Sequence, residues 1–156
     1  MPLQRELKKK RPFESSEQEA ILNLLRTNDQ YQVRFTRLFR PYGLTPSQYN
    51  VLRILRGEGQ PLPILEIASR TIAVVPGITE LVNRLEEAGF VKRERCREDR
   101  RVVWVGLTEK ARKTLAALDR PLEELHQRLI GRLSKAELKE LIRLLEKARG
   151  GLTDEE

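Results

Sequence analysis

Cysteine and histidine are scarce in this 156-residue sequence, which has one of each, Cys96 and His126. A single cysteine cannot form an intrachain disulfide, and the pair cannot supply the ligands of a zinc site. Catalytic pairs that need two histidines are excluded as well. The sequence also lacks a glycine-rich phosphate loop and a serine nucleophile elbow. We therefore expect no enzyme activity, no cofactor and no metal site.

Long apolar runs are missing too. No window approaches the roughly 18 continuous apolar residues of a membrane span, and residues 1–12 lack the apolar stretch of a signal peptide. We therefore expect a cytoplasmic protein without membrane contact. Hydrophobic residues make up 39% of the chain and aromatic residues only 5%. This lean composition, beside long apolar helical stripes, suggests that some stripes are buried against a partner chain.

Positive charge, in contrast, is abundant. The 30 Lys and Arg residues outnumber the 23 Asp and Glu residues, which gives a net charge of +7. Such a balance is typical of nucleic-acid binding, although a soluble basic protein without that function is the alternative. Residues 1–14 form a basic arm without periodicity. We predict a disordered tail there, and the alternative is an arm that adds phosphate contacts.

Helix-start and helix-stop signals bound a long amphipathic segment at residues 15–43. Ser16 and Glu19 fit a capping box at its start, and Pro41 and Gly43 mark its end. Apolar residues recur between them at steps of three and four, which predicts a helix of about 25 residues. A helix of this length commonly packs against a second subunit.

Two shorter helices are predicted next. Thr45, Pro46 and Gln48 make a complete helix start, with an N-cap, a proline at the first position and a reciprocal glutamine. After a Gly/Pro turn, a short helix is expected from Ile64 to about Thr71. Its inward-facing residues are predicted to be Leu65, Ile67 and Ala68. Two short helices joined by such a turn form the first part of a helix-turn-helix.

Residues 76–89 predict a third helix that ends at Gly89 and is followed by a hairpin. The β-prone segments 90–91 and 102–105 flank a turn that is almost entirely charged. Residues 92–101 hold six basic and three acidic residues. An arginine at such a tip can enter the minor groove of DNA, and Asp99 can fix a neighbouring arginine through a bidentate pair.

Two further helices are predicted after the hairpin. Thr108 caps the first of them, and Pro121 within it predicts a kink or a break near Asp119. Ser134 and Glu137 form the capping box of the last helix. The apolar stripes of these segments exceed what a small domain needs, which favours dimerisation.

Three stretches between Leu44 and Ala111 resemble the multiple-antibiotic-resistance regulator (MarR) family: LTPSQYNVL, ITELVNRLEEAGFVKR and EDRRVVWVGLTEKA. The resemblance implies a mainly α fold with a small β-hairpin wing. The winged helix-turn-helix would occupy residues 44–107, flanked by dimerisation helices at 15–43 and 108–156. It also implies a homodimeric transcriptional regulator, typically a repressor, that binds a pseudo-palindromic duplex operator and is released by a small-molecule or redox effector.

The resemblance also implies a set of DNA-contacting positions. The predicted DNA-binding residues are Val75, Pro76, Gly77, Thr79, Asn83, Arg84, Arg93, Arg97, Asp99, Arg100 and Arg101. The family usually has small hydroxylated residues at the positions of Val75 and Gly77, and often a basic residue at the position of Glu80. Base reading here can therefore rest on apolar contact with thymine methyls or on the later helix residues. Alternatively, affinity rests mainly on the wing and on phosphate contacts.

The effector is expected to be a small aromatic or anionic molecule, bound where the dimer helices meet the winged domain. The candidate effector-binding residues are Tyr31, Arg34, Phe35 and Tyr49. Cys96 could serve as a redox signal, but an inert strand residue is the favoured interpretation. Two alternative functions remain open: a winged-helix module that binds another protein, and an architectural DNA-binding protein of low specificity.

Overall fold

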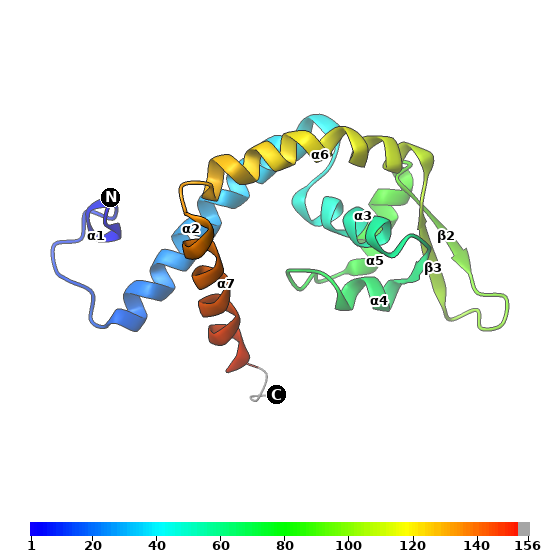
Figure 1. Ribbon diagram of the computed structural model, residues 1–156. Helices are drawn as coiled ribbons and strands as arrows, with labels where there is room; N and C mark the ends of the chain where they lie inside the picture. The colour runs from blue at the N-terminus through cyan, green and yellow to red at the C-terminus, as the bar shows by residue number, and fades with distance from the viewer. Residues whose placement is uncertain (153–156) are drawn as a thin grey trace. The chain divides into compact units, whose positions relative to one another are not determined.

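The computed structural model describes residues 1–152, and in it the chain divides into two compact units. The first unit runs from Met1 to Ala117, and the second begins at Leu118. The elements in chain order (Figure 1) are α1 (Leu3–Glu6), α2 (Ser16–Phe39), a 3-10 turn (Arg40–Tyr42), α3 (Pro46–Glu58), β1 (Leu62–Pro63), α4 (Ile64–Ser69), α5 (Ile78–Glu87), β2 (Val91–Arg95), β3 (Val103–Leu107), α6 (Glu109–Ile130) and α7 (Lys135–Gly150). The fold is mainly helical with one small antiparallel sheet, as the sequence predicts.

The basic arm begins with the helical turn α1 instead of being disordered throughout. Leu3 is buried in this turn, and the Glu6 carboxylate lies 3.7 Å from the Arg26 guanidinium on α2. The cap of α2 also differs from the prediction by one residue. The Ser15 hydroxyl, not that of Ser16, accepts a hydrogen bond from the Gln18 backbone N–H. One apolar contact and one ion pair thus order a segment whose composition alone suggests a tail.

The start of α3 is confirmed as predicted. The Thr45 hydroxyl accepts from the Gln48 backbone N–H, and the Gln48 side chain accepts from the Thr45 backbone N–H. The helix ends at Glu58, because Gly59 adopts a left-handed conformation with φ 76°. The α3 residues buried in the first unit are Val51, Leu52, Ile54 and Leu55.

Helix α4 is shorter than predicted and buries only part of the expected face. Ile67 is fully buried and Ala68 is half-buried, but Leu65 is 81% exposed. The prediction that Leu65 faces the core is therefore wrong. A helix of six residues makes fewer than two turns, so it presents a single inward row, and Leu65 lies outside that row.

The sheet has three antiparallel strands in the order β1-β3-β2. The hairpin of β2 and β3 is confirmed, and its register pairs Val91 with Leu107 and Arg95 with Val103. Strand β1 was not predicted. It has only two residues, one of them Pro63, and it gains its strand character from pairing with β3.

Of the kink or break predicted near Asp119, the structure excludes the break, because helix α6 is continuous through Pro121. Proline removes one backbone hydrogen bond, but a buried apolar row continues on both sides of it. The residues of this row are Ala111, Leu115, Leu118, Leu122 and Leu125. Burial of the row holds the helix together where propensity would interrupt it.

A joint of polar contacts connects the end of α5 to the start of α6. The Thr108 hydroxyl accepts from the Ala111 backbone N–H at 3.2 Å and donates to the Gly89 carbonyl at 2.6 Å. The Lys110 ammonium donates to the Ala88 carbonyl and lies 4.5 Å from the centroid of the Phe90 ring. The predicted cap at Thr108 is confirmed, and its second bond fixes α6 on the end of α5.

Apolar side chains remain exposed on the long helices. On α2, Ile21, Leu24 and Leu25 are 56%, 48% and 60% exposed. In the second unit the predicted Ser134 capping box starts α7, and no residue of that fully described helix is buried. Ile142 of α7 is 53% exposed. Within residues 1–152, no helix is long and apolar enough to cross a membrane.

Candidate nucleic-acid interface

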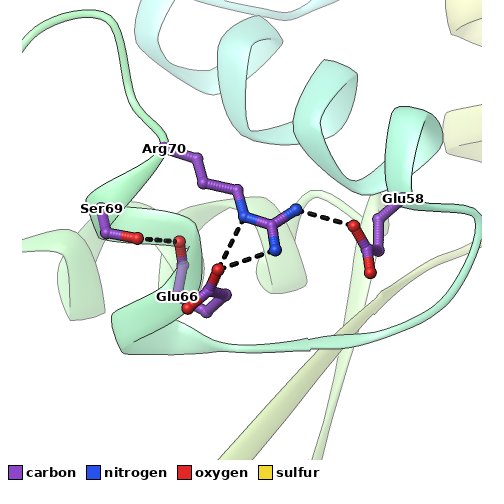
Figure 2. Close-up of polar contacts among 4 residues, drawn as sticks. All are labelled: Glu58, Glu66, Ser69 and Arg70. Carbon is purple, nitrogen blue, oxygen red and sulfur yellow. Dashed lines mark hydrogen bonds and ion pairs between the residues drawn. The ribbon is translucent and has the colours of Figure 1, made fainter.

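Arg70 links the end of α3 to α4 and thereby supports the segment that leads into α5 (Figure 2). Its guanidinium lies 2.7 Å from a carboxylate oxygen of Glu58 and 2.7 Å from one of Glu66. The Ser69 hydroxyl donates to the Glu66 backbone carbonyl at 2.8 Å. The hydrogen bond from Arg70 lowers the pKa of Glu58, and the bonds to Glu58 and then Glu66 raise the pKa of Arg70. The sequence shows the Glu66–Arg70 spacing of i,i+4, but the third member lies 12 residues from Arg70 and has no local signal.

The segment before α5 is apolar and exposed. Ile72 and Val74 are 86% and 94% exposed, Val75 is half-buried and Pro76 is exposed. Gly77 is the N-cap of α5 with φ 74°, a conformation that other residues adopt only with strain. No side chain caps this helix, and its first backbone bonds run to the Gly77 carbonyl.

On α5 itself, the charged residues pair with each other. The Arg84 guanidinium lies 3.2 Å from the Glu80 carboxylate, as the i,i+4 spacing predicts. This pair compensates an acidic charge that would otherwise repel a phosphate. Both side chains are more than half exposed, so the pair contributes only about 0.3–0.5 kcal/mol. Thr79 is exposed in the first turn of the helix.

Arg93 of β2 binds back onto α5. Its backbone N–H donates to Glu86 at 2.8 Å, and its guanidinium lies 3.0 Å from the same carboxylate. The guanidinium also donates to the side-chain oxygen of Asn83. The Arg93 side-chain bond, with the backbone bond second, lowers the pKa of Glu86. Asn83 and Arg93 were predicted as separate DNA contacts, but the structure joins them in one network between α5 and β2.

The hairpin tip, or wing, carries Arg97, Arg100 and Arg101 exposed at its surface. Asp99 holds one of them. It accepts the Arg101 backbone N–H at 3.0 Å and the Arg101 side-chain Nε–H at 3.2 Å. Another guanidinium nitrogen lies 3.4 Å from its second oxygen. These bonds lower the pKa of Asp99 and leave the Arg101 side chain 91% exposed. The bidentate pair expected at Asp99 is thus present, with Arg101 as its partner.

The aromatic candidates for effector binding lie around Phe39, which no sequence pattern marks as a binding residue. Phe39 is buried, and its ring centroid lies 6.3 Å from that of Phe35 and 4.4 Å from that of Tyr49. Tyr31 is half-buried one turn before Phe35. The Arg34 guanidinium donates to the backbone carbonyl of residue 30 at 2.7 Å. The structure therefore brings Phe35 and Tyr49 together through Phe39.

Cys96 carries a free, half-exposed thiol at the end of β2, where its backbone N–H donates to the Val102 carbonyl at 2.9 Å. Among residues 1–152, no group of three or more His, Cys, Asp or Glu side chains could hold a metal ion. The site residues present are therefore basic, apolar and hydrogen-bonding groups on a helix and a hairpin.

Three consecutive short helices, α3 to α5, followed by a hairpin with a basic tip, define a winged helix-turn-helix. The MarR family model matches residues 44–103, which is this region. The HTH-type transcriptional repressor IacR of Pseudomonas putida is 32% identical over 123 residues, covering 79% of this chain and 73% of that protein. The chain belongs to the MarR family of transcriptional regulators.

Solved structures agree with this assignment. The crystal structure of a MarR transcription factor from Planctomyces limnophilus is 42% identical, has a TM-score of 0.67 and matches 86% of this chain and 98% of its own. A MarR family regulator from Streptomyces coelicolor, solved in complex with DNA, shares the fold with a TM-score of 0.76. It is 21% identical and matches 90% of this chain and 94% of its own.

Proposed function

We propose that the protein is a homodimeric repressor that binds a pseudo-palindromic duplex operator, with α5 in the major groove and the wing in the adjacent minor groove. The observation that carries this proposal is the Asp99–Arg101 pair. It presents a guanidinium that is 91% exposed yet held by its neighbour at a hairpin tip. A narrow minor groove has enhanced negative potential and attracts an inserted arginine. The structurally similar MarR family regulator from Streptomyces coelicolor was solved in complex with DNA, which supports DNA as the partner.

The start of α5 supports the major-groove contact. N-terminal residues of a recognition helix meet base edges, and the uncapped backbone N–H groups there favour a phosphate. Gly77, the N-cap, brings no side chain between the helix end and its partner. Thr79 is exposed beside it and can donate to bases or to phosphates. The Glu80–Arg84 pair keeps the acidic residue of this turn from repelling the DNA.

The apolar faces of α2 and α7 support dimerisation. Ile21, Leu24 and Leu25 of α2 and Ile142 of α7 are each about half exposed. Burial against a second copy would remove this surface from water, which stabilises an assembly by about 25 cal/mol per Å². A dimer also presents two recognition helices to two half-sites about one helical turn apart.

Effector release completes the proposal. A small aromatic or anionic molecule would bind beside the stack of Phe35, Phe39 and Tyr49, where ring faces offer offset stacking and Arg34 offers a cation. The stack connects α2, which carries the proposed dimer surface, to α3 of the winged region. A ligand there would change how the two recognition helices of the dimer are placed relative to the two half-sites. Such a change is a general route to loss of operator binding.

Selection of bound duplexes from a random pool tests the DNA-binding part. We expect a palindrome with half-sites about 10 base pairs apart and affinity that falls steeply with salt. Replacing Arg101 by alanine should weaken binding to that palindrome by about 1–3 kcal/mol and leave the fold intact. Operator affinity equal to that of the wild type would remove the wing from the mechanism. No enriched duplex and a flat salt response would favour the protein-binding alternative.

Sedimentation of the whole chain tests the dimer. We expect twice the monomer mass, and a shift to the monomer when Leu25 on α2 is replaced by glutamate. Leu65 on α4 is the matched control, since it is an exposed leucine of the same unit that the proposed dimer surface does not include. A glutamate there should leave the mass unchanged. A monomeric wild type would refute the dimer while leaving the DNA test independent.

A further inference from the structure

We infer that Ile72 and Val74, in the loop before α5, read thymine methyl groups in the major groove. This inference rests on the proposed DNA binding and names the feature of the operator that the protein recognises. The two side chains have the highest exposed fractions, 86% and 94%, among the large hydrophobic residues of positions 1–152. Exposed aliphatic side chains of this size are costly to leave in water, and these two stand within five residues of the recognition-helix N-cap.

The arginines that would normally read guanine are already bound by acidic groups. Arg70 lies between Glu58 and Glu66, and Arg84 pairs with Glu80. If Arg84 turned to a base, it would leave the Glu80 carboxylate facing DNA without its partner. Arg70 and Arg84 are thus paired within the protein, whereas Thr79 is the exposed side chain of the first turn of α5 that can donate to a base or a phosphate.

The network between α5 and β2 also engages Asn83, and asparagine is a common side chain for base recognition. An asparagine recognises adenine by accepting with its side-chain oxygen and donating with its nitrogen. Here the Asn83 oxygen accepts from Arg93, whose guanidinium also binds Glu86. A bidentate contact to adenine would require this network to break. The exposed apolar side chains of Ile72 and Val74, in contrast, have no polar contact that would have to break on binding to DNA.

Ile72 and Val74 suit a methyl group for two reasons. Thymine is the base that presents a methyl group in the major groove, and apolar side chains are its usual contacts. Both residues are β-branched, so their side chains have few rotamers and lose little freedom on binding. Val75, which follows them, is half-buried. The loop is therefore an exposed apolar surface next to the end of α5 at which a recognition helix meets bases.

Uracil substitution in the selected operator tests the inference, because uracil keeps every hydrogen-bonding group of thymine and lacks only the methyl. Replacing the contacted thymine in one half-site should weaken wild-type binding about fourfold, and replacing it in both half-sites about fifteenfold. Uracil placed outside the half-sites is the DNA control and should change nothing.

Matched protein variants assign the effect to the loop. Val74→Thr and Ile72→Thr keep the β-branch and replace a methyl or ethyl group by a hydroxyl at exposed positions, so the fold is retained. Each should bind the thymine operator less tightly and lose most of the difference between thymine and uracil. Leu65→Thr removes an equally exposed leucine from α4 and should keep the wild-type difference.

Two results would overturn the inference while leaving DNA binding established. One is equal wild-type affinity for the thymine and uracil operators. The other is a full thymine preference retained by both loop variants, which would assign the methyl contact to another residue. Failure of the proposed function is seen earlier, at the selection step, as the absence of any bound duplex, and the inference would fail with it.

Discussion

Replacing Thr108 by valine should destabilise the protein by about 2–3 kcal/mol, although the two side chains have nearly the same shape. The Thr108 hydroxyl caps α6 by accepting from the Ala111 backbone N–H, and it donates to the Gly89 carbonyl at the end of α5. Valine keeps the volume and the β-branch and removes both bonds. The change therefore isolates the hydrogen bonding of the joint between α5 and α6.

The two lost bonds differ in cost. Ala111 is fully buried, so its N–H cannot readily exchange the hydroxyl for water, and an unsatisfied buried donor costs about 1–3 kcal/mol. Loss of an N-cap measured in other helices costs about 0.5–2 kcal/mol, which is consistent. Gly89 is half-buried, so its carbonyl recovers part of its bond from water, and we assign it less than about 1 kcal/mol. The midpoints of these two ranges add up to about 2.5 kcal/mol, within the expected 2–3 kcal/mol.

Urea unfolding at fixed protomer concentration measures this free energy, and the concentration is held constant because the stability of the proposed dimer would depend on it. Thr108→Ser is the matched control, since it keeps the hydroxyl and loses one methyl, and it should cost less than about 1.5 kcal/mol. A valine variant within about 0.5 kcal/mol of the wild type would refute the role of the hydroxyl. A serine variant as unstable as the valine variant would show that the methyl, not the cap, matters.

Three further changes test other parts of the structure. Asp99→Asn should weaken operator binding about threefold to tenfold, because it releases Arg101. Glu98→Gln is the control, since it removes the same charge from the wing and should not weaken binding. Titration of labelled operator compares the two variants. The lowered pKa of Glu86 means that its pair stabilises the fold above the ordinary pKa of 4.5 and that this contribution disappears as pH falls through the lower folded value. Glu86→Gln should therefore be less stable than the wild type at pH 7, and the difference in denaturant midpoint should shrink as the pH falls through the lowered folded pKa of Glu86. Gly77→Ala should lower stability by about 1–2 kcal/mol in the same assay, because its φ is 74°.

The fold was predictable where short-range signals determine it. The capping boxes at Thr45 and Ser134 each join two residues within four positions of one another, and the structure has both. The hairpin follows from two β-prone segments around a charged turn. The break predicted from Pro121 is wrong for a different reason, since the local effect of the proline is outweighed by burial of the apolar residues on both sides of it in α6. Strand β1 exists only through its pairing with β3, and no local pattern specifies it.

The candidate site divides in the same way. The pairs Glu80–Arg84 and Asp99–Arg101 join residues four and two positions apart, so the sequence indicates them directly. Arg93 binds Glu86 and Asn83, which lie seven and ten positions earlier, across the turn between α5 and β2. These contacts within the protein can be seen only in the folded structure. The residue type of Arg93 predicts a phosphate contact, but the fold places Glu86 and Asn83 beside it as competing partners.

In the proposed interface, affinity and specificity rest on different side chains. The wing arginines contact phosphates or the minor groove, and their contribution weakens as salt replaces released counterions. The loop before α5 contributes through apolar contact, which salt does not screen. Added salt should then weaken binding to thymine and uracil operators together while leaving their ratio nearly constant. If the paired arginines read the bases instead, the thymine and uracil operators should bind with equal affinity at every salt concentration. One titration series therefore distinguishes the two arrangements.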